Sequence, residues 1–125
     1  MSCRRQPYSL YQGEARKPTV TVFKADGSIQ NLTGGVVEFQ VKPKVGDPDS
    51  ALLLAKVSPF GIIILDQTVG GDTEGQLQIC LEVADTKDIP IGTYFYDVVL
   101  VLPGFDRSYI ISPSPFSILD VVNQA

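Results

Sequence analysis

Apolar and polar residues alternate most clearly in two neighbouring stretches in the second half of the chain. In Gln76–Val83 every second residue is apolar, which is the period of a strand with one buried and one wet face. The second stretch, Thr93–Leu102, is rich in aromatic and β-branched residues and nearly free of charge, so it is predicted to be a central strand. We expect these two strands and Phe39 to form much of the core. The inward row of the first strand is Leu77, Ile79, Leu81 and Val83.

Shorter segments with strand-like patterns lie on both sides of this pair, separated by turns rich in glycine, proline and aspartate. They are Tyr8–Tyr11, Pro18–Lys24, Val36–Lys42, Ala51–Val57, Ile62–Leu65, Arg107–Ile111 and Phe116–Val122. Ala51–Val57 could instead form a helical turn. The sequence Ser112-Pro113-Ser114-Pro115 is expected to interrupt the pairing before the last strand, because proline has no N–H to donate. Only Ala84–Asp88 has the pattern of a helix, of one turn at most.

These elements predict an all-β fold. The 125 residues form one domain on length alone. We predict an immunoglobulin-like antiparallel β-sandwich of about seven to nine short strands over residues 8–125, preceded by an N-terminal arm at residues 1–7. Tyr94 begins a long strand after a loop, which is the place of the tyrosine corner in immunoglobulin-like folds. An ordinary half-buried strand tyrosine accounts for Tyr94 equally well.

The composition argues against catalysis. The chain has no histidine, which removes the usual general base near neutral pH and the commonest metal ligand. Its serines have no partner base in sight and no G-x-S-x-G motif occurs, so we predict no enzyme activity, no catalytic residue and no cofactor. Asp97 is expected to point outward and to pair with a base on a neighbouring strand. Cys80 is interpreted as a half-buried structural thiol on the wetter side of its strand, and a disulfide with Cys3 is disfavoured.

Charge and hydrophobicity limit the kinds of partner. The net charge is −4 and the ten basic residues are mostly scattered, which is a poor footprint for nucleic acid or an anionic membrane. No apolar run approaches the roughly 20 residues of a membrane helix, and we expect no secretion signal at the N-terminus. Two loops gather acids that could hold calcium, but their spacing is not that of an EF-hand, so we interpret them as solvated turn residues and predict no metal site. These acids are Asp47, Asp49, Asp66, Asp72 and Glu74.

The N-terminal segment combines arginine, lysine and tyrosine in an otherwise acidic chain. Arginine and tyrosine are the residue types enriched where interfaces carry their binding energy, so this segment is the candidate assembly surface. The candidate interface residues are Arg4, Arg5, Tyr8, Tyr11, Arg16 and Lys17. Two alternatives stay open. The segment could be a solvated tail, or Tyr8–Tyr11 could be the first strand of the sandwich and leave only Met1–Pro7 free.

Several short motifs occur along the chain in a characteristic order. They are Asp26-Gly27-Ser28, Leu32-Thr33-Gly34, Val37-x-Phe39-x-Val41-Lys42, Gly75-x-Leu77, Asp85-Thr86 and Gly92-Thr93-Tyr94-Phe95-Tyr96-Asp97-Val98. In this order the chain, over about residues 8–122, resembles the small immunoglobulin-like structural proteins of tailed bacteriophages and is similar to the N-terminal module of upper baseplate proteins. Relatives commonly carry a glycine between the last two strands, where this chain has Ser112-Pro113-Ser114-Pro115. Many relatives also continue into a receptor-binding or stalk region, whereas this chain stops at Ala125.

The resemblance implies a non-enzymatic virion component that acts through protein–protein contacts. Attachment at the neck, tail or baseplate is the first expectation, and capsid decoration is the second. The expected partners are other virion structural proteins, with the chain homo-oligomeric or present in many copies, assembled in the host cytoplasm, and with no contact to nucleic acid or membrane. The alternative from another class is a carbohydrate-binding module that recognises host-surface glycans. The absence of tryptophan weakens that alternative, because exposed aromatic platforms hold sugars in such modules.

Overall fold

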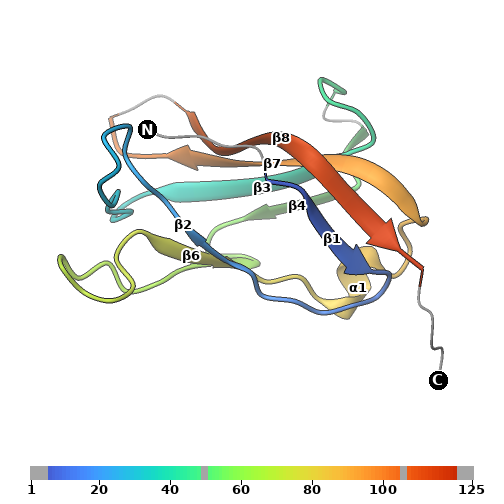
Figure 1. The fold of residues 1–125 in the computed structure, drawn as a ribbon, viewed down its shortest axis with the longest axis horizontal. Coiled ribbons are helices and arrows are strands. Elements are labelled where there is room, and N and C mark those ends of the chain that lie inside the picture. The colour runs from blue at the N-terminus through green and yellow to red at the C-terminus, as the bar shows by residue number, and fades with distance from the viewer. Residues whose placement is uncertain (1–5, 49–50, 105–106, 121–125) are drawn as a thin grey trace.

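The computed structural model describes residues 6–48, 51–104 and 107–120, and it shows two β-sheets packed face to face (Figure 1). Only one short helix accompanies the strands in this part of the chain. The elements are β1 (Tyr8–Tyr11), β2 (Thr19–Thr21), β3 (Val36–Lys42), β4 (Leu54–Val57), β5 (Ile62–Ile64), β6 (Gln76–Ile79), α1 (Val83–Thr86), β7 (Gly92–Val101) and β8 (Ser108–Leu119). The predicted all-β sandwich is confirmed.

The strand order is that of an immunoglobulin-like sandwich. One sheet has five strands in the order β1-β8-β7-β3-β4, and the other has three in the order β2-β6-β5. In immunoglobulin nomenclature β8, β7, β3 and β4 take the places of G, F, C and C′, and they face β2, β6 and β5 as B, E and D. The pairing is antiparallel except between β1 and β8, which run parallel.

The core lies between the two sheets, as the alternation predicted. Val37, Phe39 and Val41 point inward from β3, and the rings of Phe39, Tyr96 and Phe116 lie 5.7–6.1 Å apart between centroids. From the opposite sheet the core receives Leu77, Ile79 and Leu81. The strand β7 is central, with β3 on one side and β8 on the other. The predicted packing of the inward row against Phe39 and β7 is therefore confirmed for its first three members.

The fourth member of that row, Val83, was wrongly predicted to be buried. The strand β6 ends at Ile79, although Cys80 still donates to Gly61 and Leu81 to Arg16 through their backbones. At Glu82 a capping box with Asp85 starts α1 and turns the chain away. Val83 begins α1 and is 53% exposed. Cys80 is buried and free of a disulfide, so its placement on the wetter side was also wrong, and Cys3 lies outside the described residues.

The segment Ser112–Pro115 does not interrupt pairing, contrary to prediction. The strand β8 runs through it, and Ser112 and Pro113 together lie opposite Asp97 in a β-bulge. A bulge leaves one residue outside the ladder, so a missing N–H is tolerated there. Pro115 pairs with Phe95 just before β1 begins to cover the other side of β8. The predicted inward residues Phe116 and Ile118 are buried, whereas Asp120 is exposed.

The connection from β6 to β7 is an immunoglobulin-type corner. The hydroxyl of Tyr94 donates to the carbonyl of Pro90 at 2.6 Å, four residues upstream, so the tyrosine-corner interpretation is confirmed. The preceding turn of helix, α1, overlaps the predicted one-turn segment. Its first turn is capped by Asp85, which accepts the N–H of Glu82 at 2.7 Å. The corner thereby fixes where the central strand β7 enters its sheet.

Candidate functional site

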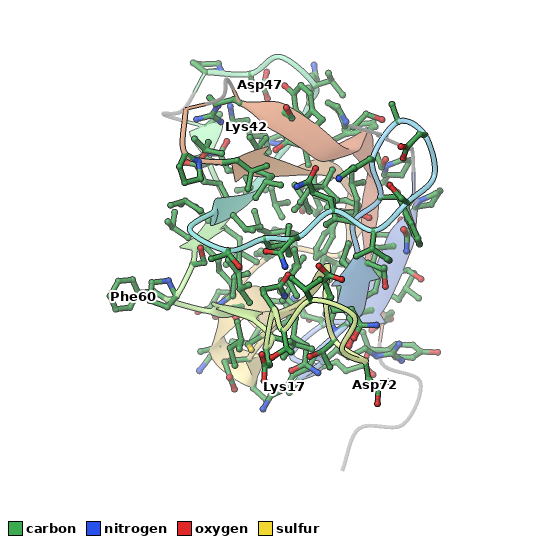
Figure 2. All side chains as sticks on the ribbon, turned by 90° about the vertical axis from the view of Figure 1, so that its left-hand side faces the viewer. Lys17, Lys42, Asp47, Phe60 and Asp72 are labelled. Atoms are coloured by element: carbon green, nitrogen blue, oxygen red, sulfur yellow. The ribbon has the colours of Figure 1, made fainter. Side chains whose placement is uncertain are left out.

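An exposed apolar patch lies along β4 and the turn that follows it. We call it the β4 patch; its residues are Leu53, Ala55, Val57 and Phe60. Leu53, Val57 and Phe60 are 39%, 42% and 80% exposed, and Figure 2 shows the ring of Phe60 pointing away from the body of the protein. Aromatic side chains presented in this way are the usual anchors of protein–protein interfaces.

The turn that carries Phe60 is held by backbone hydrogen bonds. Phe60 donates to the carbonyl of Val57 at 2.7 Å, and Ser58 donates to the carbonyl of Val37 at 2.9 Å. Ser58 also accepts the N–H of Val37 through its hydroxyl at 2.9 Å. Gly61 closes the turn with φ +81°, a conformation that favours glycine. Phe60 is therefore presented from a well-anchored turn, which lowers the entropy that a partner would have to remove.

An ion pair beneath the patch links β4 to α1. Nζ of Lys56 lies 2.9 Å from Oδ2 of Asp85, and the two side chains are only 11% and 18% exposed. On its way the aliphatic chain of Lys56 covers Gly61, where an added Cβ would come within 2.8 Å of it. Lys56 thus points into the sandwich, and its alternating neighbours Ala55 and Val57 point outward. For this reason β4 shows no charge on its outer face.

A polar hollow of about 210 Å³ lies on the outer face of β3 and β7. It is lined by Gln40, Lys42, Lys44, Val45, Gly46, Phe95, Tyr96, Asp97, Tyr109 and Pro113. Burial raises the pKa of Asp97 above its ordinary value, and the positive charges of Lys42 and Arg107 partly oppose this. Gln40, not a base, lies directly opposite Asp97 on β3. Lys42, a base on the neighbouring strand β3, acts on Asp97 through its charge from two positions beyond Gln40, and Arg107 also acts on it through its charge.

Of the predicted interface residues that the structure describes, Tyr8 and Arg16 lie within hydrogen-bonding reach of one another. Tyr8 is half-buried and stacks on Phe116 with 6.0 Å between ring centroids, and burial raises the pKa of its hydroxyl. Tyr11 is exposed, as is Lys17, which Figure 2 labels. Arg16 pairs with Glu14 at 2.8 Å. Arg4 and Arg5 lie outside the described residues. The alternative that Tyr8–Tyr11 is the first strand of the sandwich is confirmed.

Gln6, two residues before that strand, is also attached to the domain. Gln6 donates its N–H to the hydroxyl of Ser114 at 2.9 Å, and its carbonyl accepts a hydrogen bond from the hydroxyl of Tyr96. Gln6 belongs to the segment that we assigned to the arm at residues 1–7. Its contacts reach the central strands β7 and β8, so the arm joins the sandwich at Gln6 and Pro7.

The acidic loops use their carboxylates for local hydrogen bonds. Asp66 accepts the N–H and the hydroxyl of Thr68, and these bonds hold its pKa below the ordinary range. Glu74 accepts from the side chain of Asn31 and from the N–H of Gly70, with the same effect on its pKa. The described residues contain no group of three or more potential metal-binding side chains. Of the acids considered for calcium, Asp49 lies outside the described residues, and Asp72 is exposed at the surface in Figure 2.

Comparisons with known proteins add no relative: no family model matches the chain, and no curated protein is similar to it. Within residues 6–48, 51–104 and 107–120, no helix has the length and apolar character needed to cross a bilayer.

Sequence reasoning missed the β4 patch. A signal for it was present, because Phe60 follows Pro59 in a turn, where small polar residues are the usual choice. A large aromatic residue in a turn has no core to enter. Together with the exposed side chains of Leu53 and Val57, it makes this surface a candidate contact site.

Proposed function

We propose that the chain is a non-enzymatic structural component of a tailed bacteriophage virion and acts through protein–protein contacts. The observation that carries the contact role is the β4 patch, which presents Phe60 and an uncharged strand face from a well-anchored turn. The assignment to a phage particle rests on the sequence resemblance, whose longest motif, Gly92–Val98, begins the central strand β7. Neck, tail or baseplate attachment is the first choice and capsid decoration the second, with assembly in the host cytoplasm.

Mass spectrometry of purified particles tests this role. We expect the chain at a fixed stoichiometry in intact virions. A Phe60→Ser variant should fold normally, because the ring is 80% exposed, but it should be incorporated less well. Val69→Ser is the matched control, since Val69 is equally exposed but lies in the loop between β5 and β6. Absence of the chain from particles, or equal loss of incorporation in both variants, would contradict the proposal.

A pair of truncations tests the N-terminal arm separately. Removal of residues 1–5 leaves the contacts of Gln6 with Ser114 and Tyr96 in place, so the melting temperature should stay near that of the full chain. Removal of residues 1–7 deletes those contacts of Gln6 and should lower the melting temperature. If the arm attaches the chain to the particle, the variant that lacks residues 1–5 should fold but should not be incorporated. If this variant is incorporated to the same extent as the full chain, the β4 patch is the attachment surface instead.

The polar hollow favours a second candidate function, recognition of host-surface glycans. The rings of Phe95 and Tyr109 lie beside Gln40, Lys42 and Asp97, which combines apolar faces with hydrogen-bonding groups as sugar sites require. Binding of the full chain to an array of bacterial surface glycans tests it. Tyr109→Ala should abolish any glycan binding while leaving particle incorporation unchanged. Glycan binding that survives this substitution, or no binding at all, would remove the candidate.

A further inference from the structure

A second hollow lies beside Phe60, and it is apolar. We call it the Pro59 hollow; it has a volume of about 340 Å³ and lies between the start of β3 and the strand β5. None of the side chains that line it is charged, and Val36 and Ile63 are exposed where they border it. The lining residues are Gly35, Val36, Ser58, Pro59, Ile63 and Ile64.

The size and the chemistry of the Pro59 hollow fit an aromatic ring. A dry cavity of about 150 Å³ lined by apolar side chains binds benzene, so a hollow of about 340 Å³ has room for a phenyl ring. The chain's own Phe60 lies outside the hollow: its ring is 80% exposed and points away from the body of the protein in Figure 2. Because Phe60 directly follows Pro59, one chain presents an exposed ring and an apolar hollow side by side.

The ring and the hollow complement each other across two copies of the chain. We propose that two copies associate about a two-fold axis, with Phe60 of each copy in the Pro59 hollow of the other. In a two-fold interface the same surface of both copies takes part, so one ring–hollow contact is made in both directions. A second copy thereby covers both features in a single encounter. A different protein would need its own exposed ring and its own apolar hollow, at the same spacing, to do as much.

The charges around this surface permit two copies to approach. The chain carries a net charge of −4, so two copies repel one another in general, but the ring and the hollow are uncharged. The charged neighbours of Val57 are compensated within the chain. Glu38, which lies opposite Val57 in the ladder, pairs with Arg107 at 2.8 Å. Lys56 pairs with Asp85 at 2.9 Å. Contact at this surface therefore brings no unpaired charge of β3 or β4 against the second copy.

The exposed apolar area predicts a weak association. Taking roughly 150–200 Å² for each fully exposed side chain, Phe60, Val36, Val57 and Ile63 together expose roughly 350 Å². Two copies would bury about twice this area, which is below the roughly 1,200 Å² of stable complexes. We therefore expect a reversible dimer with a dissociation constant of about 100 μM, which forms where many copies are held close together, as in a particle.

This inference names one partner for the proposed contact role and rests on that role. The two can fail separately, because sedimentation of the isolated chain reports on self-association, whereas incorporation into particles reports on the virion role. A chain that is incorporated but stays monomeric in solution up to millimolar concentration would overturn the exchange of Phe60 and leave the proposed function standing.

Two substitutions, one on each side of the contact, test the exchange by sedimentation equilibrium. Phe60→Ser removes the ring, and Val36→Glu places a charge at the hollow. Each should weaken the dimer at least about tenfold, because the same contact is lost twice. Val69→Ser, at an exposed valine in the loop between β5 and β6, should leave the association unchanged. Circular dichroism shows whether the Val36→Glu chain is folded, and Phe60→Ser alone still decides the test if it is not.

Three results would overturn the proposal. Association of Phe60→Ser like that of the parent chain would show that the ring is not used. Loss of association in Phe60→Ser but not in folded Val36→Glu would place the ring against another surface. Species that grow beyond the dimer as the concentration rises would show a head-to-tail contact, which does not close, in place of the reciprocal one.

Nuclear magnetic resonance of the parent chain gives a direct readout of the contact. A chain labelled with ¹³C at its isoleucine methyl groups is mixed with unlabelled chain at a concentration where the dimer is populated. We expect intermolecular nuclear Overhauser effects from the methyl groups of Ile63 to aromatic protons of the unlabelled copy. They should vanish when the unlabelled copy is Phe60→Ser. Ile91, an exposed isoleucine just before β7, should show none and serves as the internal control. Effects at Ile91 with none at Ile63 would place the interface elsewhere and overturn the proposal.

Discussion

The ion pair between Lys56 and Asp85 allows a quantitative test of how the β4 edge is held. Nζ of Lys56 and Oδ2 of Asp85 are 2.9 Å apart, and both side chains are largely shielded from water. The same carboxylate oxygen of Asp85 accepts the N–H of Glu82, which caps α1. We predict that removing either charge destabilises the protein, because the remaining charge loses its partner where little water can replace it.

The expected size of the effect follows from the burial. Breaking a fully buried ion pair costs about 3–5 kcal/mol, whereas an exposed pair contributes at most about 1 kcal/mol. This pair lies between these limits, so Asp85→Asn should cost about 2–3 kcal/mol. Lys56→Met should cost about 1–2 kcal/mol, because methionine keeps the contact with Gly61 and the carboxylate keeps the N–H of Glu82. The double variant leaves neither charge unpaired. Its loss of stability should therefore be about 1–2 kcal/mol smaller than the sum of the losses of the two single variants.

Urea unfolding of the four proteins at pH 7, followed by circular dichroism, measures these free energies. The m value should be the same for all four, so that midpoints can be compared directly. Two results together would show that the pair behaves like an exposed one. Each single variant would unfold with a free energy within about 0.5 kcal/mol of the parent, and the double variant would lose the sum of the two single losses. The account of the shielded edge would then be refuted.

Three further substitutions test the core, the corner and the polar hollow by the same unfolding measurement. Leu81→Ala should cost about 2–5 kcal/mol because Leu81 is buried in the core, and a change below about 0.5 kcal/mol would contradict this. Tyr94→Phe should cost about 0.5–1.5 kcal/mol by removing the hydrogen bond to Pro90, and an unchanged midpoint would show that water replaces it fully. Burial raises the pKa of Asp97 in the folded protein. Ionised Asp97 therefore lowers the free energy of unfolding, and this loss develops as the pH rises from the ordinary pKa of aspartate through the raised pKa. Asp97→Asn should therefore raise the free energy of unfolding at pH 7 and have no such effect at a pH below the ordinary pKa of aspartate. Equal effects at the two pH values would contradict the raised pKa of Asp97.

Alternation predicted the strands well where one face is buried along the whole element. In Val36–Lys42 each inward residue meets the opposite sheet, so the pattern and the structure agree residue by residue. The same pattern failed at Val83, although the alternation continues there. What turns Val83 outward is the start of α1, where Glu82 and Asp85 form a capping box and Val83 enters the first turn of the helix, a signal that the two-residue period of a strand does not contain.

The candidate surface was harder to predict than the fold, for a physical reason. Leu53 and Val57 look like core residues in the sequence, and Lys56 looks like a surface residue. The structure reverses these roles, because Lys56 pairs with Asp85 inside and β4 is the last strand of its sheet among the described residues. Whether an apolar residue is core or contact depends on which strand lies at the edge, and strand order is set by pairings between distant segments.

The bulge in β8 borders the polar hollow and lies apart from β4 in the sheet. Ser112 and Pro113 stand opposite Asp97, and both Pro113 and Asp97 line the polar hollow. At this segment the proposed resemblance to phage structural proteins would place a glycine, and the chain has Ser112-Pro113-Ser114-Pro115 instead. The departure therefore alters the face that would bind a glycan, whereas β7 and β3 lie between β8 and the β4 patch. Replacing Pro113 by glycine should change glycan binding without changing incorporation into particles, whereas a joint loss would show that the two faces are coupled through the sheet.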